Sequence, residues 1–119
     1  MFRFEKPDVW HRAIEFADVV YLATRMFPDD ERFRLTGQIR RASASVSSNI
    51  AEGCGRISDK GFARFIEIAY GSLMEVTSQA EIAHRHSFRS VEDRNRLKEE
   101  AEQLSRMLSG LRIKLLSTS

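Results

Sequence analysis

The chain has 119 residues, of which 42% are hydrophobic and 30% are charged, and its formal net charge is +2. These proportions exclude a chain that is disordered as a whole, and the length fits a single domain over residues 1–119. The one cysteine, Cys54, excludes an internal disulfide, and the sequence predicts neither a signal peptide nor a membrane span, so we expect a cytoplasmic protein.

The first predicted helix covers residues 7–26. Pro7 and Asp8 suit a first helical turn, and the side chains of one face then recur at spacings of three and four. They are Trp10, Ala13, Ile14, Ala17, Tyr21 and Thr24. Pro28 ends this helix, because a proline disfavours helical geometry in the residue before it.

The second predicted helix covers residues 31–54, and its core face consists of Leu35, Ile39, Ala42, Val46, Ile50 and Gly53. The run over residues 42–48 is rich in serine, as many loops are. The helical spacing nevertheless continues through it, so the run is predicted to be helical. Gly53 and Gly55 then provide the stop signals that are typical of a helix end.

The third and fourth predicted helices cover residues 59–86 and 91–117. Ser58 is a suitable N-cap for the third helix, and an acidic first turn favours the start of the fourth. Their core positions are Phe62, Phe65, Ile68, Ala69, Ser72, Val76, Gln79, Ala80 and Ala83, and then Leu97, Ala101, Leu104, Leu108, Leu111 and Leu115. Because the connections are short, the four helices predict an all-α, antiparallel up-down-up-down four-helix bundle.

The second and third helices carry more apolar surface than a four-helix monomer needs. Each has a second row of small or apolar side chains on the side away from its core face. The rows are Ala44, Ser47, Ser48 and Ala51, and Ala63, Ile66, Tyr70 and Met74. We predict that they form the interface of a homo-oligomer, the alternative being apolar residues scattered over the surface of a monomer.

Polar side chains also flank the core faces of these two helices. Asn49 lies nearest to the predicted core and would need hydrogen-bonding partners there. We predict a partly buried polar network formed by Asn49, Glu52, Glu75 and Gln79. The alternative is that these side chains form an ordinary solvated face.

Positive charge is concentrated in one part of the chain. Residues 31–57 contain five arginines and only two acidic residues, Glu31 and Glu52. We predict that basic side chains form a stripe that contacts phosphates of RNA or DNA, and its members are Arg34, Arg40, Arg41, Arg56, Lys60 and Arg64. The alternative is that arginines such as Arg40 and Arg41 pair with acidic residues on neighbouring helices.

The sequence predicts no catalytic residues, no metal site and no cofactor. Glu81 and His84 form a single Glu-x-x-His pair, whereas a di-metal helix bundle uses two such pairs. His84 and His86 lie about 200° apart around a helix, so both cannot bind one metal ion. Cys54 has no histidine beside it in sequence and is predicted to be structural.

Three stretches of the chain resemble a known family. They are Gln38-Ile39-Arg40-Arg41-Ala42, Ser48-Asn49-Ile50-Ala51-Glu52-Gly53 with Gly55-Arg56, and Ile68-Ala69-Tyr70-Gly71-Ser72-Leu73-Met74-Glu75. Trp10, Ala13, Tyr21, Phe27 and Pro28 fit the same pattern, so the resemblance covers roughly residues 4–83. On these residues the chain resembles the four-helix-bundle proteins encoded in intervening sequences of bacterial large-subunit (23S) ribosomal RNA genes.

This resemblance implies a bacterial, cytoplasmic, non-enzymatic four-helix bundle that assembles into a five-membered ring. The family is similar to the accessory protein of diversity-generating retroelements, a basic pentameric barrel that associates with reverse transcriptase and nucleic acid. Gly61 and the run Ala83-His84-Arg85-His86 depart from the family pattern.

The predicted function is therefore that of a homo-oligomeric adaptor. Its expected partners are further copies of itself and either RNA, DNA or a nucleic-acid-processing protein, with no membrane involved. A protein-protein scaffold that does not bind nucleic acid is the first alternative. A metal-dependent enzyme is the second, and metal analysis of the purified protein would test it.

Overall fold

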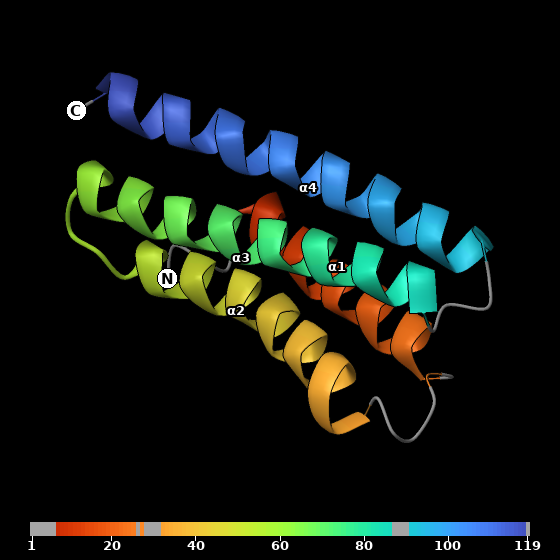
Figure 1. The fold of residues 1–119 in the computed structure, drawn as a ribbon. Helices are drawn as coiled ribbons and strands as arrows, with labels where there is room; N and C mark the ends of the chain where they lie inside the picture. The colour runs from red at the N-terminus through yellow and green to blue at the C-terminus, as the bar shows by residue number, and fades with distance from the viewer. Residues whose placement is uncertain (1–6, 26, 28–31, 87–90, 119) are drawn as a thin grey trace.

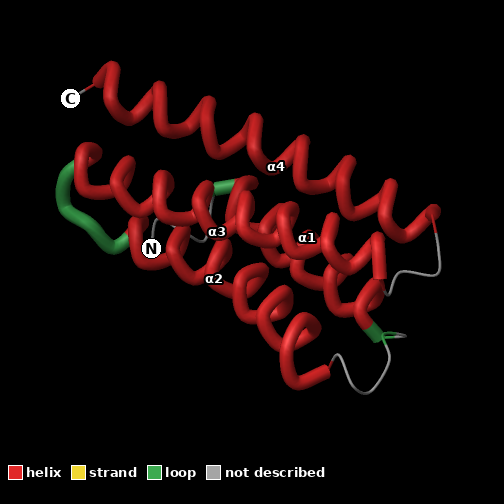
Figure 2. Tube along the Cα trace, viewed as in Figure 1, coloured by secondary structure: helices red, strands yellow, loops and turns green. Residues whose placement is uncertain are grey.

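The computed structural model describes residues 7–25, 27, 32–86 and 91–118, which are helical apart from short turns (Figure 2). The elements are α1 (Asp8–Thr24), a five-residue π-helical turn η3 (Arg32–Thr36), α2 (Gly37–Cys54), α3 (Asp59–His86) and α4 (Val91–Thr118). No strand occurs within the described ranges, so the all-α prediction is confirmed. None of the described helices is long and apolar enough to cross a membrane.

The four helices pack side by side into an elongated body that measures 46 × 22 × 20 Å (Figure 1). Successive helices run in alternating directions in Figure 1, an arrangement that is compatible with an up-down-up-down bundle. α3 packs against α2 on one side and α4 on the other, and α1 contacts both α2 and α4. α3 therefore has two long contacts, one with α2 and one with α4, which we call the α2–α3 seam and the α3–α4 seam.

Most helix ends follow the sequence signals, but α2 begins at Gly37, six residues after the predicted start at residue 31, and the π-helical turn η3 precedes it. Ser58 caps α3 as predicted, since its Oγ accepts a hydrogen bond from the Gly61 backbone N–H at 3.0 Å. α1 ends at Thr24, two residues before the predicted end at residue 26. Pro28, which is predicted to end the first helix, lies outside the described residues.

The core is one continuous cluster to which all four α-helices contribute. Phe16, Val46, Ile50, Leu73 and Leu104 are fully buried in it. The predicted core face of α1 is partly wrong, because Ile14 and Tyr21 are 38% and 46% exposed while Val9, Phe16 and Val20 are buried instead. Apolar side chains cover more than half of the circumference of α1, so their spacing alone did not select the buried side.

Gly53 allows the close approach of α2 and α3 where the two helices meet. A Cβ atom at this position would lie 2.8 Å from Phe62 Cδ1 and 2.8 Å from Phe65 Cβ. No real Cβ atom tolerates such contacts, so any larger residue would force the helices apart. Just beyond, the Arg56 guanidinium lies over the Phe65 ring, 4.4 Å from its centroid.

Candidate functional site

Basic side chains meet at the end of the bundle where α3 begins and α4 ends. A hollow of about 550 Å³ lies there, with Lys60 and Arg64 of α3 and Arg112 of α4 on its walls. Ser58, Gly61, Glu67 and Leu116 complete its lining. Arg112 is a member of this group that the sequence did not predict, because only the fold brings the end of α4 beside the start of α3.

The charges in this hollow are not balanced. Arg112 Nε lies 3.6 Å from Glu67 Oε2 in a half-exposed ion pair. Within the described part of the chain, no acidic side chain pairs with Lys60 or Arg64. The hollow therefore presents two uncompensated positive charges to solvent.

A second hollow of about 320 Å³ continues along the same seam. It is lined by Ile66, Glu67, Tyr70, Leu108, Ser109 and Arg112, and it shares Glu67 and Arg112 with the first hollow. Tyr70 remains 37% exposed on its wall. We call the two hollows together the α3–α4 groove.

The other predicted phosphate-binding residues do not join this groove. Arg40 is a link between helices, since its Nε donates to Thr24 Oγ1 at 2.9 Å and its guanidinium lies 4.5 Å from the centre of the Tyr21 ring. Arg34 and Arg41 are exposed elsewhere, and Arg56 pairs with Glu52 at 3.8 Å. The expected single stripe is thus divided into separate groups, because only Arg40 and Arg41 lie on α2, where they point to different sides, while the other members lie before or after this helix.

A polar groove lies along the contact between α2 and α3, on the side of α3 that faces away from the α3–α4 groove. We call it the α2–α3 groove. Ser45 Oγ and Ser72 Oγ share a hydrogen bond of 2.9 Å across the seam, and Asn49 Nδ2 donates to the Ser45 carbonyl at 2.8 Å. Gln38, Arg41, Ala42, Ser45, Glu75 and Gln79 line a hollow of about 490 Å³ beside these bonds. The Gln79 Oε1 atom is buried there without a hydrogen-bond donor.

The four members of the predicted partly buried polar network lie in two places, and two of them are exposed. Asn49, Glu75 and Gln79 lie at the α2–α3 seam, whereas Glu52 pairs with Arg56 at the end of α2. Glu52 and Glu75 are exposed. The short serines bring the two helices together, so the longer glutamate side chains extend past the seam into solvent.

The predicted oligomer interface is divided between two faces. Ala44 and Ser48 are exposed on α2 and Ala51 is half-buried, while Ser47 is buried. Ala63 and Ile66 of the α3 row are each only 1% exposed, because α4 covers them, and the prediction that they face a second copy is wrong. Tyr70 and Met74 remain 37% exposed.

The sequence did not predict that α1 carries an exposed apolar surface. Arg40 ties α2 to Tyr21, and the exposed Ala44 and Ser48 follow Arg40 at helical spacing on the same face of α2. Ile14 and Tyr21 lie on one face of α1 and are both exposed. We call these exposed residues of α1 and α2 the α1–α2 face.

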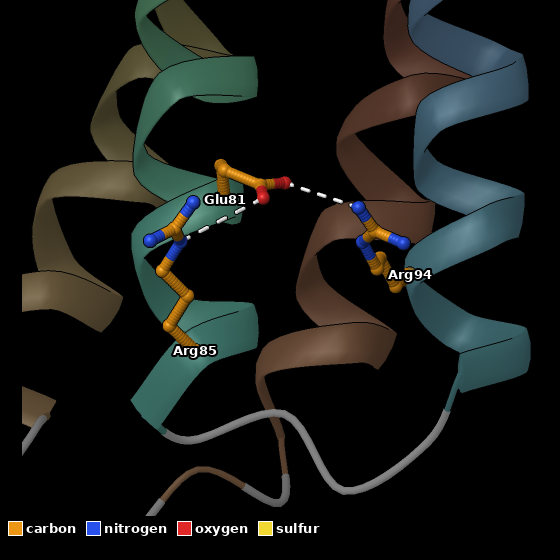
Figure 3. A network of polar contacts seen from close by, with 3 residues as sticks. All are labelled: Glu81, Arg85 and Arg94. Carbon is orange, nitrogen blue, oxygen red and sulfur yellow. Dashed lines mark hydrogen bonds and ion pairs between the residues drawn. The ribbon is translucent and has the colours of Figure 1, made fainter.

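Glu81 of the Glu-x-x-His pair takes part in a salt-bridge cluster. Glu81 lies between Arg94 of α4, at 3.2 Å, and Arg85, at 3.9 Å (Figure 3). The hydrogen bond from Arg94 is the main cause that lowers the pKa of Glu81 below its ordinary value. Within the described ranges, no three histidine, cysteine, aspartate or glutamate side chains converge as metal ligands.

The sequence matches the family model described as "23S rRNA-intervening sequence protein" over residues 5–110. Among solved structures, the chain is similar to a Bacteroides thetaiotaomicron protein of unknown function from the S23 ribosomal protein family. The identity is 22%, the TM-score is 0.78, and the match covers 87% of this chain and 94% of that chain. No curated protein matches the sequence.

Proposed function

The chain belongs to the 23S rRNA-intervening sequence protein family, and from this premise we propose that it is a non-enzymatic, homo-oligomeric adaptor for RNA or a ribonucleoprotein. In this proposal an antiparallel up-down-up-down bundle assembles into a pentamer in the bacterial cytoplasm and needs no cofactor. The pentamer is what the family resemblance implies.

The observation that carries the self-assembly part is the α1–α2 face. Ile14 and Tyr21 are large apolar side chains with substantial exposure, and the exposed Ala44 and Ser48 of the neighbouring helix α2 are small enough for a second helix to approach. Exposed apolar side chains that gather on one part of a surface mark a contact surface more often than a chance composition. A second copy of the chain is the occupant we propose.

The nucleic-acid part is supported by the uncompensated charges of Lys60 and Arg64. A ring of copies would repeat this basic surface around its axis. Repetition converts weak individual contacts into useful affinity, because each bound site raises the local concentration of ligand at the next.

Light scattering on the purified protein at micromolar concentration tests the assembly. We expect a pentamer, and a monomer would contradict the proposal. Ala44→Glu should dissociate the assembly, because it places a charge in an apolar contact. Gln103→Glu on the exposed side of α4 is the matched control, since it also introduces a carboxylate and should leave the assembly unchanged.

Binding of labelled RNA over a range of salt concentrations tests the adaptor role. Contacts to phosphates release counterions, so the affinity should fall steeply as salt rises. Absence of RNA and DNA binding at low salt would exclude this part of the proposal while leaving self-assembly intact.

A protein-protein scaffold is the second candidate, and the exposure of Tyr70 and Met74 favours it. In that case the affinity for a partner helix would depend little on salt. Substitution of Tyr70 or Met74 by aspartate would abolish capture of that partner.

A further inference from the structure

We propose that the α3–α4 groove binds a single strand of nucleic acid, with its phosphates on Lys60, Arg64 and Arg112 and one base stacked on Tyr70. This inference rests on the nucleic-acid part of the proposed function and assigns it to a site. It keeps Lys60 and Arg64 of the predicted stripe, leaves out the four arginines of that stripe, and adds Arg112 of α4.

The basic residues lie on one line along the groove. Lys60, Arg64 and Glu67 follow one another on α3 at spacings of three and four, so they face the same side, and Arg112 reaches this side from α4. Lys60 and Arg64 lack acidic partners within the described ranges. A phosphate that approaches them therefore displaces no existing ion pair.

Arg112 can exchange its ion pair with Glu67 for a contact with a phosphate. The side chains of Arg112 and Glu67 are 44% and 55% exposed, and an ion pair this exposed contributes little stability. A guanidinium also presents two parallel N–H donors that match the oxygens of a phosphate. Glu67 is the one acid in the groove lining and works against an anionic ligand.

Tyr70 favours a single strand over a duplex. Its ring lies in the hollow that adjoins the basic one, on the same face of α3 as Glu67. Lys60 and Tyr70 are separated by about 15 Å of helix, since each residue advances an α-helix by about 1.5 Å. Bases of a single strand can stack on an exposed aromatic ring, whereas paired bases in a duplex are stacked on each other.

The α2–α3 groove is a poorer candidate for the same ligand. Arg41 is the one cation in its lining, and Glu75 in the same lining opposes its charge. No aromatic side chain lines that hollow. Of these two grooves, the α3–α4 groove is the one that combines excess positive charge with an exposed ring.

The experiment measures the affinity of the full-length oligomer for fluorescently labelled single strands of RNA and of DNA, about 12 nucleotides long, at low salt. The variant K60A/R64A/R112A should lose about tenfold or more in affinity, because three phosphate contacts disappear. The matched control R34A/R41A/R96A also removes three exposed positive charges, but none from the groove, and should lose less than about threefold.

Variants of Tyr70 test base stacking apart from charge, and a variant of Glu67 tests charge in the opposite direction. Tyr70→Ala should weaken binding about tenfold, whereas Tyr70→Phe should bind like the wild type because stacking needs only the ring. Glu67→Gln should bind more tightly. Circular dichroism and light scattering confirm that each variant keeps its fold and assembly.

The contradicting outcomes are distinct. If the two triple variants lost affinity equally, nucleic acid would be attracted by the overall positive charge and not by the groove. This result would overturn the groove assignment but not the proposed function. A preference for duplex would indicate that the protein recognises the shape of a double helix, and equally effective competition by polyglutamate would indicate an acidic protein partner. Either result would overturn the inference. A wild type that binds no nucleic acid would overturn both the inference and the adaptor role.

Discussion

The two seams that flank α3 are built in different ways. At the α2–α3 seam, short side chains meet directly, as in the 2.9 Å hydrogen bond between Ser45 and Ser72, and Gly53 removes the last obstacle to contact. At the α3–α4 seam, long charged side chains reach across, as Arg112 does to Glu67 and Arg94 does to Glu81. The first seam fixes the geometry of the bundle, and the second leaves chemical groups accessible.

This difference predicts different sensitivities. Where small residues meet directly there is little free space, so that contact should respond strongly to added volume and little to pH. A seam bridged by exposed ion pairs should tolerate added volume but respond to pH and salt. Each seam can therefore be perturbed with little effect on the other.

Gly53→Ala should have the largest effect. The new Cβ atom would lie 2.8 Å from Phe62 Cδ1 and 2.8 Å from Phe65 Cβ, so α2 and α3 must move apart. We expect a loss of about 1–3 kcal/mol in the free energy of unfolding, measured by urea denaturation. Gly55→Ala is the control, because its Cβ would meet only the Glu52 carbonyl at 3.4 Å. Equal losses in the two variants would mean that the seam is not close-packed.

The serine pair should have the next largest effect. Ser45→Ala leaves the Ser72 hydroxyl, and Ser72→Ala leaves the Ser45 hydroxyl, without its cross-seam partner. Each single variant should lose about 1 kcal/mol of stability, and the double variant should lose less than the sum of the two. A coupling energy near zero in this double-mutant cycle would indicate that the hydrogen bond does not hold the seam together.

The tight seam was largely predictable from sequence, and the open seam was not. Ser45, Asn49, Ser72 and Gly53 are short residues at helical spacing, and a close contact between α2 and α3 follows from their size. Asn49 and Gln79, which were predicted as members of a partly buried polar network, lie at that seam and are half-buried.

The α3–α4 groove required the fold. α3 has two apolar sides, and its own periodicity does not indicate which side α4 covers, so Ala63 and Ile66 were assigned to an oligomer interface although they are buried. Arg112 lies 48 residues after Arg64, and no local pattern joins them. α1 poses the same problem, because Ile14 and Val9 both fit a helical stripe and only packing distinguishes them.

Two other glycines sharpen the contrast with Gly53. A Cβ atom at Gly71 on α3 or Gly110 on α4 would meet nothing within 4 Å. Gly71→Ala and Gly110→Ala should each raise the free energy of unfolding by about 0.5–1 kcal/mol, because alanine reduces the entropy of the unfolded chain and favours helix. The comparison is best made by denaturation under conditions that keep one oligomeric state. If Gly71→Ala lowered the free energy of unfolding instead, Gly71 would have to make a contact in the oligomer that a single chain lacks.

The smallest effect should appear at Glu81, where the open seam responds to pH. Because the hydrogen bond from Arg94 lowers the pKa of Glu81 in the folded protein, the interaction stabilises the fold above the ordinary carboxyl pKa of 4.5. That stabilisation is lost as the pH falls through the lowered pKa. Glu81→Gln should remove this part of the acid sensitivity, as measured by the melting temperature between neutral and acidic pH.

A direct NMR titration of the Glu81 carboxyl group identifies the partner responsible. Arg94→Gln should return the pKa of Glu81 most of the way toward 4.5, whereas Arg85→Gln should change it less, because Arg85 lies farther away at 3.9 Å and makes no hydrogen bond of this kind. Added salt should act on the wild type in the same direction as Arg94→Gln, since the pair is exposed. If Arg94→Gln left the pKa of Glu81 unchanged and only Arg85→Gln raised it, α3 alone would account for the effect and the ion pair across the seam would not matter.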